Sequence, residues 1–305
     1  MEKDLISIKN LTRKDLDDIF ILTDGLKKTP DRFSHTLERK MLALIFEKPS
    51  CRTRVSFEVG MYQLGGGSLY LGPDQIKLGL RESIGDIART LSRYVDGIVL
   101  RTFAHENIIQ MSEFAAVPVI NALTDLLHPC QALADLYTIR ERFSDFNGLT
   151  LAFIGDGNNV CHSLLYACSK LGLNLNIAAP KRYSPQSGIL KEAKAFALIS
   201  GAKINLFNEA GSAAKGADLI YTDVWASMGQ DKEAKVRRRE FKNFQLNKEL
   251  MLLAKKKCLV MHCLPAHRGE EITQEVIDSP NSIVFDQAEN RLHVQKAVLI
   301  KLLNK

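Results

Sequence analysis

Arginine and hydroxyl side chains gather in the segment Ser50–Arg54, directly after an apolar run at 41–46 that is typical of a buried strand. Ser50 stands where the N-cap of a helix should stand, so Arg52 and Thr53 fall in the first helical turn. Backbone N–H groups lack acceptors there and the helix dipole is positive. The segment therefore predicts a binding site for a phosphate or a phosphorylated small molecule.

A second pair of candidate polar groups is His128 and Gln131. Pro129 at the first helical position places His128 at the cap, and Gln131 lies three residues on, on the same face. An imidazole N–H and an amide NH2 in this arrangement could both donate to one carbonyl oxygen, as an oxyanion site requires. The alternative is a capping histidine beside an exposed glutamine, and these residues alone leave both open.

Polar residues also stand where predicted strands end, namely Arg101, Asp156, Asn159, Asp223, His262 and Cys263. Ligands of parallel sheets bind at the carboxyl ends of the strands, so we expect these residues to line a crevice. Asp223 precedes a loop that contains the only tryptophan and ends at Gly229. An acid in that position suits an ammonium group, and the alternative is a capping aspartate beside a buried tryptophan.

Two other kinds of site are not favoured by the sequence. The glycine-rich segment 155–160 has Val160 at the third glycine position of a dinucleotide fingerprint, and no acid closes the next strand. The segment 262–267 has metal-ligand residue types but no second cluster, so we expect no metal. His262 and Cys263 are neighbours on a strand and point to opposite faces, so Cys263 could contact Asp223 instead. The alternative for Cys263 is a small buried hydrophobe.

Strand and helix patterns alternate along the chain and restart after Asn147-Gly148, a turn signal. The predicted strands cover 41–46, 68–71, 97–101, 117–120, 150–154, 174–178, 203–207, 218–222, 258–262 and 282–285. Two predicted helices begin at Thr12 and after Ser50, where Val55, Val59 and Tyr62 recur at helical spacing. The other predicted helices cover 83–94, 105–115, 129–143, 160–171, 186–199, 247–254, 273–277 and 287–303. The segment 223–246 is predicted to be a long loop. The pattern predicts two α/β domains, each a parallel sheet flanked by helices.

Composition and charge also indicate which classes of partner and location are not expected. The 305 residues are 46% hydrophobic and 25% charged, as in ordinary globular proteins. The net charge of +6 is mild, and the densest basic run, 235–239, is interpreted as a solvated loop or helix face, so no nucleic-acid partner is expected. No apolar run is long enough for a membrane span, and the N-terminus lacks the pattern of a signal peptide. Six scattered cysteines without a C-x-x-C pair suit free thiols, so a cytoplasmic location is expected.

Taken in order, these segments resemble the aspartate/ornithine carbamoyltransferase family, in particular its ornithine branch. The matching blocks span nearly the whole chain: Ser50–Arg54, Arg101–Thr102, His128–Asp135, Gly155–Asn159, Asp223–Gly229, His262–Pro265 and Glu289–Arg291. The resemblance implies a trimer without metal or organic cofactor. It also implies a carbamoyl phosphate domain at 1–146, an ornithine domain at 147–286 and a last helix at 287–305 that packs on the first domain.

The resemblance also implies residue roles. The grip on carbamoyl phosphate is expected from Ser50, Cys51, Arg52, Thr53 and Arg101, with Lys77 reaching a neighbouring subunit's site. His128, Gln131 and Thr53 are expected to polarise the carbonyl, and Arg291 to bind the carbamoyl group. L-Ornithine is expected to contact Asn159, Asp223, Ser227 and Met228, while Cys263 and Leu264 lie beside the attacking amine. Arg101, His128, Gln131, Asp223, Cys263 and Arg291 form the expected catalytic set.

Two residues depart from the family pattern. Cys51 replaces the usual threonine, although its backbone N–H remains available. Lys77 is typical of the aspartate branch, whereas the blocks Asp223–Gly229 and His262–Pro265 favour the ornithine branch. The expected reaction carbamoylates the δ-amine of L-ornithine to give L-citrulline for arginine biosynthesis. The alternatives are another amine such as putrescine or N-acetylornithine, the catabolic direction, or a non-catalytic relative, which would be expected to lack the charged residues found here.

Overall fold

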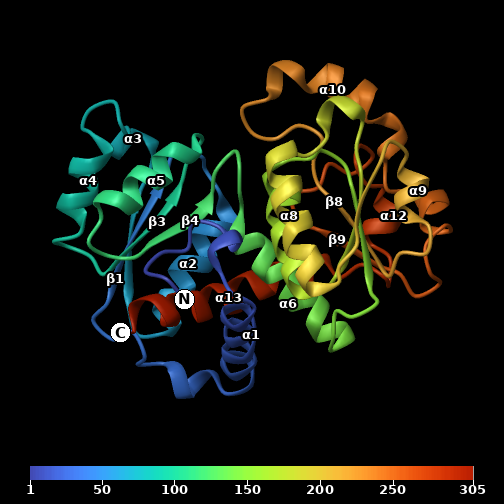
Figure 1. The fold of residues 1–305 in the computed structure, drawn as a ribbon. Helices are drawn as coiled ribbons and strands as arrows, with labels where there is room; N and C mark the ends of the chain where they lie inside the picture. The colour runs from blue at the N-terminus through green and yellow to red at the C-terminus, as the bar shows by residue number, and fades with distance from the viewer. Residues whose placement is uncertain (305) are drawn as a thin grey trace. The chain divides into compact units, whose positions relative to one another are not determined.

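The computed structural model describes residues 1–304, and for Asp231 the backbone alone. The chain forms two compact units: Met1–Tyr137 together with the segment that begins at Glu289, and Thr138–Ala288. Each unit is a parallel sheet flanked by helices (Figure 1), as predicted. Within the described residues, no helix has the length and apolar character needed to cross a membrane.

The first unit contains a four-stranded parallel sheet in the order β2-β1-β3-β4. Its strands are β1 (Met41–Phe46), β2 (Gly67–Leu71), β3 (Gly97–Arg101) and β4 (Val119–Leu123). Its helices are η1 (Ile8–Asn10), α1 (Arg13–Lys28), η2 (Pro30–Phe33), α2 (Cys51–Gln63), α3 (Pro73–Ile76), α4 (Ile84–Leu91), α5 (His105–Phe114), the start of α6 (Pro129–Phe143) and most of α13 (Val284–Leu303). The chain adds β2 on one side of β1, and β3 and β4 on the other, so the topological switch point lies between the carboxyl ends of β1 and β3.

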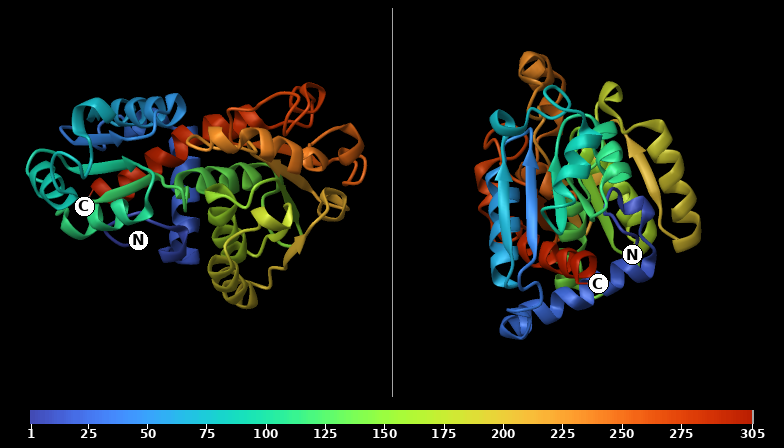
Figure 2. Two further views of the ribbon diagram at one scale, coloured as in Figure 1. Left: turned by 90° about the horizontal axis from the view of Figure 1, so that it is seen from above. Right: turned by 90° about the vertical axis from the view of Figure 1, so that its left-hand side faces the viewer.

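Helix α13 packs against α2 within the first unit. A Cβ atom on Gly60 of α2 would lie 3.3 Å from Cγ of Lys296, so the glycine allows the two helices to approach closely. The ammonium group of Lys296 also donates to Oε1 of Gln63 at 2.8 Å. The helix can be followed in red in both views of Figure 2. This packing holds the α13 residues that follow Glu289 beside α2.

The second unit contains a five-stranded parallel sheet in the order β7-β6-β5-β8-β9. Its strands are β5 (Thr150–Ile154), β6 (Asn174–Ala178), β7 (Ile204–Phe207), β8 (Leu219–Thr222) and β9 (Leu259–His262). Its helices are α7 (Asn159–Leu171), η3 (Lys181–Tyr183), α8 (Ser187–Ser200), α9 (Ala210–Ala214), η4 (Asp231–Glu233), α10 (Ala234–Glu240), η5 (Lys242–Phe244), α11 (Lys248–Met251) and α12 (Gln274–Ile277). The switch point here lies between the carboxyl ends of β5 and β8.

Two predicted elements are wrong. In the predicted strand 282–285, Ser282 makes only an isolated bridge with Val260, and α13 already begins at Val284. Asp286 in the first turn of α13 suits the positive end of the helix dipole and so favours this early start. The predicted loop 223–246 contains α10, which has no apolar stripe; its buried residue is Arg237. Hydrophobic periodicity therefore could not reveal this helix.

Candidate active site

The N-terminus of α2 lies at the switch point of the first unit. Ser50 has extended backbone angles, and its hydroxyl accepts a hydrogen bond from the Thr53 N–H at 3.3 Å, so the predicted N-cap is confirmed. The helix begins at Cys51, whose side chain is exposed. Arg52 is half-buried, and its guanidinium has no hydrogen-bond or ion-pair partner among the described residues. Its guanidinium is available to an anion.

Arg54 differs from Arg52 although both stand in the first turns of α2. Its Nε donates to Oε1 of Glu58 at 2.9 Å, and its guanidinium lies 3.8 Å from the ring centroid of Tyr70. These contacts satisfy the Arg54 charge within the protein. Only one of the two arginines is thus left to bind an anion.

Arg101 ends β3, on the other side of the switch point. Its side chain is 5% exposed, and its Nε donates to the Lys48 carbonyl at 3.1 Å. Its terminal nitrogens have no partner among the described residues. Burial, together with the charges of Arg291 and Arg52, lowers the pKa of Arg101 to about 10. A buried cation held near other cations is stabilised by a bound anion, which supports the predicted phosphate site.

His128 is buried just before α6. Burial, reinforced by the positive charges of Arg291, Arg101 and Arg52, holds its pKa well below the usual range for histidine. The imidazole is therefore neutral near pH 7 and carries a single N–H. A neutral donor surrounded by arginines suits a carbonyl oxygen that becomes negative during a reaction.

Arg291 and Gln131 extend this cluster. Arg291 donates to Oε1 of Gln131 at 2.5 Å and to Oγ1 of Thr53 at 3.1 Å. The amide nitrogen of Gln131 donates to Oδ1 of Asp135 at 2.8 Å, which fixes the amide orientation. Gln131 is buried, so the alternative of an exposed glutamine is excluded. The structure thus gathers Thr53, Arg101, His128, Gln131 and Arg291 around the start of α2.

Lys77 is not gathered into this cluster within one chain. It is exposed at the end of α3, and its ammonium group has no hydrogen-bond or ion-pair partner among the residues the structure describes. Its φ of 40° is in the left-handed region, which non-glycine residues rarely occupy. Such backbone strain often accompanies a functional constraint.

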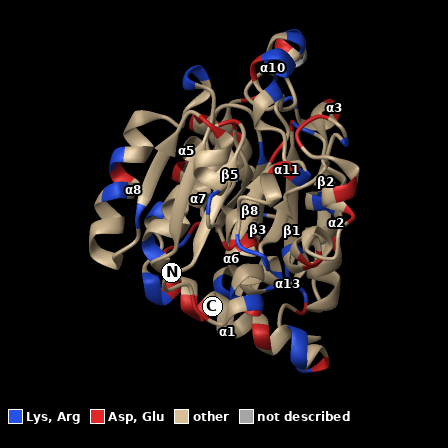
Figure 3. Cartoon of the chain, turned by 90° about the vertical axis from the view of Figure 1, so that its right-hand side faces the viewer, with Lys and Arg blue, Asp and Glu red and all other residues tan. Residues whose placement is uncertain are grey.

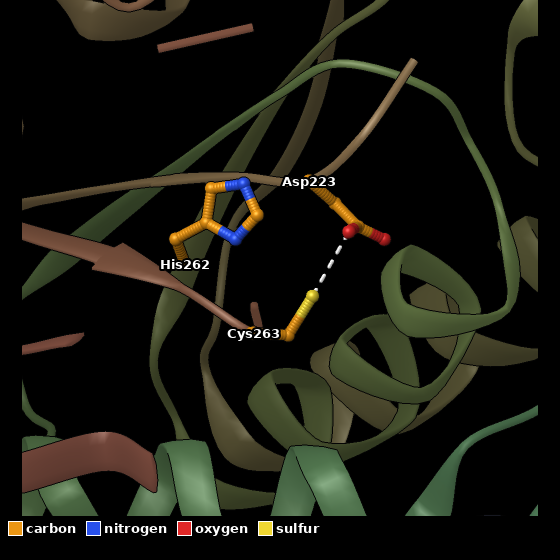
Figure 4. Close-up of side chains that lie close together, drawn as sticks. All are labelled: Asp223, His262 and Cys263. Atoms are coloured by element: carbon orange, nitrogen blue, oxygen red, sulfur yellow. Dashed lines mark hydrogen bonds between the residues drawn. The ribbon is translucent and has the colours of Figure 1, made fainter. Parts of the chain in front are cut away.

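The second unit carries a carboxylate–thiol pair at its own switch point. The Cys263 thiol donates to Oδ1 of Asp223 at 2.9 Å, which confirms the contact expected between these two strand ends (Figure 4). Oδ2 of Asp223 accepts from the side-chain amide of Asn158 at 2.7 Å. Oδ1 of Asn158 in turn accepts from the N–H groups of Val160 and Cys161, at the start of α7. Asn158 is thus both the cap of α7 and the support of Asp223.

His262 lies in the same group, and its ligand atom and those of Asp223 and Cys263 all lie within 4.8 Å of one another. These are metal-ligand types, but both ring nitrogens of His262 already have partners. Nδ1 accepts from the Leu264 N–H at 2.8 Å, so Nε2 carries the proton and pairs with buried Glu271 at 2.9 Å. Metal binding at His262 would have to displace one of these contacts.

The remaining candidates of the second unit lie close to this pair in the sequence. Asn159 is the first residue of α7, and its carbonyl accepts from the Ser163 hydroxyl at 3.0 Å. The Ser227 N–H donates to the Gln230 side chain, and Met228 is 48% exposed. Leu264 has a positive φ of 56° and directs its N–H to His262.

Sequence reasoning missed several residues that support the two sites. Asp135 was detectable from its i+4 spacing to Gln131 on one helix. The contacts of Glu271 with His262 and of Arg237 with Asp156 left no local signal, because the partners lie nine and 81 residues apart.

Comparison with known proteins agrees with this geometry. Residues 3–141 match the family model "Aspartate/ornithine carbamoyltransferase, carbamoyl-P binding domain", and residues 147–302 match "Aspartate/ornithine carbamoyltransferase, Asp/Orn binding domain". Ornithine carbamoyltransferase of Thermococcus kodakarensis is 52% identical over 97% of this chain and 95% of that protein. The anabolic ornithine carbamoyltransferase of Pyrococcus furiosus is 54% identical over 86% of this chain and 84% of that protein.

A solved structure of ornithine carbamoyltransferase from Pyrococcus furiosus superposes with a TM-score of 0.96 at 49% identity, covering 98% of this chain and 96% of that chain. With both family models matched and such identity over nearly its full length, the chain belongs to the aspartate/ornithine carbamoyltransferase family.

Proposed function

We propose that this chain transfers the carbamoyl group of carbamoyl phosphate to the δ-amine of L-ornithine, giving L-citrulline and phosphate, as a cytoplasmic enzyme of arginine biosynthesis. The observation that carries the proposal is the cluster of arginines around neutral His128 at the start of α2, which suits a phosphate joined to a carbonyl. The identity to ornithine carbamoyltransferases, one of them named anabolic, supports the substrate and the direction.

In this proposal the phosphate group binds at the N-terminus of α2. Free backbone N–H groups, including that of Cys51, donate to its oxygens, and the Ser50 and Thr53 hydroxyls line the same turn. Arg52 and Arg101 neutralise its charge through guanidinium groups whose remaining N–H donors have no partner among the described residues. The Cys51 thiol is not needed for this role.

The carbamoyl carbonyl then faces His128, Gln131 and Arg291. When the neutral δ-amine attacks the carbonyl carbon, a C–N bond forms and negative charge grows on the oxygen. Donors that are already oriented stabilise that charge without reorganising. The C–O bond to phosphate then breaks, the attacking nitrogen passes one proton to the departing phosphate, and phosphate leaves toward the arginines of α2.

In this proposal the residues of the second unit bind the amine substrate. An aliphatic amine has a pKa near 10.4 in water and is mostly protonated, so the enzyme must select or generate the neutral form. In this proposal the Cys263 thiol contacts the δ-amine, with Leu264 beside it; the hydrogen bond of the thiol to Asp223 supports this role. Asn159, Asp223, Ser227 and Met228 bind the α-amino and carboxylate groups of ornithine.

A steady-state assay of carbamoyl phosphate consumption with several amines tests the function. We expect the highest kcat/KM with L-ornithine, and much lower values with N-acetyl-L-ornithine, putrescine and L-aspartate. A higher value with any of these competitors would replace ornithine as the substrate. No turnover with any amine would indicate a non-catalytic relative.

Asp223→Asn is expected to raise KM for ornithine at least tenfold while leaving the Kd for carbamoyl phosphate nearly unchanged. A charge-assisted hydrogen bond contributes about 1.5–3 kcal/mol, and the substitution removes that charge. Kinetics measure the first quantity and calorimetry the second. Asp218→Asn, which changes an aspartate just before the amino end of β8, is the control. Equal damage to both substrates would make Asp223 a structural residue.

We also propose that the protein is a trimer in which Lys77 completes the anion site of a neighbouring subunit. Val55 and Tyr62, two of the apolar residues that predicted α2, are 49% and 80% exposed in the single chain. Exposed apolar side chains on one helix are typical of an association surface. The unpartnered ammonium group of Lys77 is available for a ligand outside its own chain.

Mixed oligomers test this assignment of Lys77. Lys77→Ala and Arg52→Ala, each expected to have low activity alone at limiting carbamoyl phosphate, are dissociated, mixed and reassembled, and citrulline formation is measured. A shared site pairs intact Lys77 of one chain with intact Arg52 of another, so we expect part of the activity to return. Differently tagged chains show that mixed oligomers form. Mixed oligomers without recovered activity would mean that Lys77 serves its own chain or has only a structural role.

A further inference from the structure

Helix α10 carries the basic run 235–239, of which one member is buried. Figure 3 shows the mainly blue helix with acidic residues beside it. Lys235, Arg238 and Arg239 are exposed, as the sequence predicted for the run, but Arg237 is only 6% exposed. A buried guanidinium needs partners. The proposed reaction gives Arg237 no direct role, so its contacts require another explanation.

The partners of Arg237 come from three separate segments of the second unit. Its Nη1 donates to Oδ2 of Asp156 at 2.8 Å and to the Trp225 carbonyl at 2.9 Å. Its guanidinium carbon lies 4.6 Å from the ring centroid of Tyr183. Its Nε also donates to Glu233, one turn earlier on the chain, at 3.2 Å. One side chain thus joins α10 to the end of β5, to the segment after β8 and to η3.

Two of these partners lie close in the sequence to Asp223, which is proposed to bind ornithine, and to Asn158, which supports Asp223. Asp156 is two residues before Asn158, and Trp225 is two residues after Asp223. Asn158 and Asp223 contact each other at 2.7 Å. Arg237 therefore connects the same two chain segments, through an ion pair with Asp156 and a hydrogen bond to the Trp225 carbonyl.

The electrostatics of this region point the same way. Burial raises the pKa of Asp156 to about 6; Arg237 opposes that rise, and the charges of Asp223 and Glu233 add to it. Ionised Asp156 and Asp223 repel each other at neighbouring strand ends. The positive charge of Arg237 offsets this repulsion and lets both carboxylates stay at the switch point.

We infer that Arg237 is a positioning residue for the amino-acid substrate: it holds the segment Asp223–Gly229 against the carboxyl end of β5 without touching the substrate. Loss of this bridge frees the segment that carries Asp223, Ser227 and Met228. The consequence is weaker ornithine binding, with little effect on the carbamoyl phosphate site of the first unit. The inference rests on the proposed function and adds a residue to it.

The test separates KM from kcat in four variants. Arg237→Gln is expected to raise KM for ornithine at least tenfold, with kcat at saturating ornithine and the Kd for carbamoyl phosphate each within about threefold of wild type. Arg237→Lys keeps the charge but has no planar fork to serve both Asp156 and the Trp225 carbonyl, so we expect an intermediate KM. Arg238→Gln, which removes an exposed neighbour paired with Glu270, is expected to match wild type.

The fourth variant combines Arg237→Gln with Asp156→Asn. It removes the carboxylate left buried without its partner, so we expect a lower KM than in Arg237→Gln alone. Circular dichroism and calorimetric binding of carbamoyl phosphate verify that each variant folds. If Arg237→Gln does not fold, the KM for ornithine of Arg237→Lys tests the inference instead.

An unchanged KM for ornithine in folded Arg237 variants would overturn the inference, as would an equal shift in Arg238→Gln. Equal losses in kcat and in carbamoyl phosphate binding would also overturn it, since they would show a general structural role. Failure of the proposed function has a different signature, because the wild-type protein itself would then form no citrulline.

Discussion

Replacing His128 by alanine is expected to lower kcat about a hundredfold or more, because losing one oriented donor to an oxyanion has an effect of that size in well-studied enzymes. Burial, reinforced by the charges of three arginines, lowers the pKa of the imidazole and keeps it neutral. The hydrogen bond that its N–H donates to the substrate carbonyl strengthens as negative charge moves onto the oxygen. The loss is therefore larger in the transition state than in the bound substrate.

Steady-state kinetics and direct binding of carbamoyl phosphate separate these two states. We expect the Kd for carbamoyl phosphate to change only a few fold in His128→Ala, while kcat and kcat/KM fall together. His128→Asn retains an amide donor near the same place, so part of the rate should return. A change confined to KM for carbamoyl phosphate would make His128 a ground-state ligand and remove it from the catalytic set.

Arg52→Ala is expected to weaken carbamoyl phosphate binding at least tenfold, since a charge-assisted contact to phosphate contributes about 1.5–3 kcal/mol. Arg52 has no partner among the described residues, so its donors are free for the ligand. Isothermal titration with carbamoyl phosphate or inorganic phosphate measures the loss. High salt should reduce this loss of phosphate affinity less than it would reduce the contribution of a surface ion pair, because the site is partly buried.

Arg54→Ala is the matched control for this prediction. It removes the same charge two residues along the same helix, but that charge is already satisfied by Glu58 and Tyr70. We expect less than a threefold change in phosphate affinity. Equal losses in the two variants would mean that Arg52 contributes only to the general positive field around α2.

The sequence determined the architecture and the chemical character of both sites. Alternating strand and helix patterns required parallel sheets. In each sheet residues meet at the carboxyl ends of neighbouring strands: those after Phe46 and Leu100 in the first unit, and those after Ile154 and Thr222 in the second. Ser50 is capped as predicted because an N-cap depends on neighbours only three residues away. The family resemblance rests on the same local blocks, and for that reason it was visible without coordinates.

The tertiary structure decided which partners those residues have. The direction of Gln131 depends on Arg291, 160 residues away, and burial of Arg237 depends on Asp156, 81 residues away. Helix α13 begins where a strand was predicted, and Ser282 makes only an isolated bridge with Val260 of β9. Local sequence patterns report periodicity and caps, whereas the pairing of a buried charge is set by side chains that folding brings from distant segments.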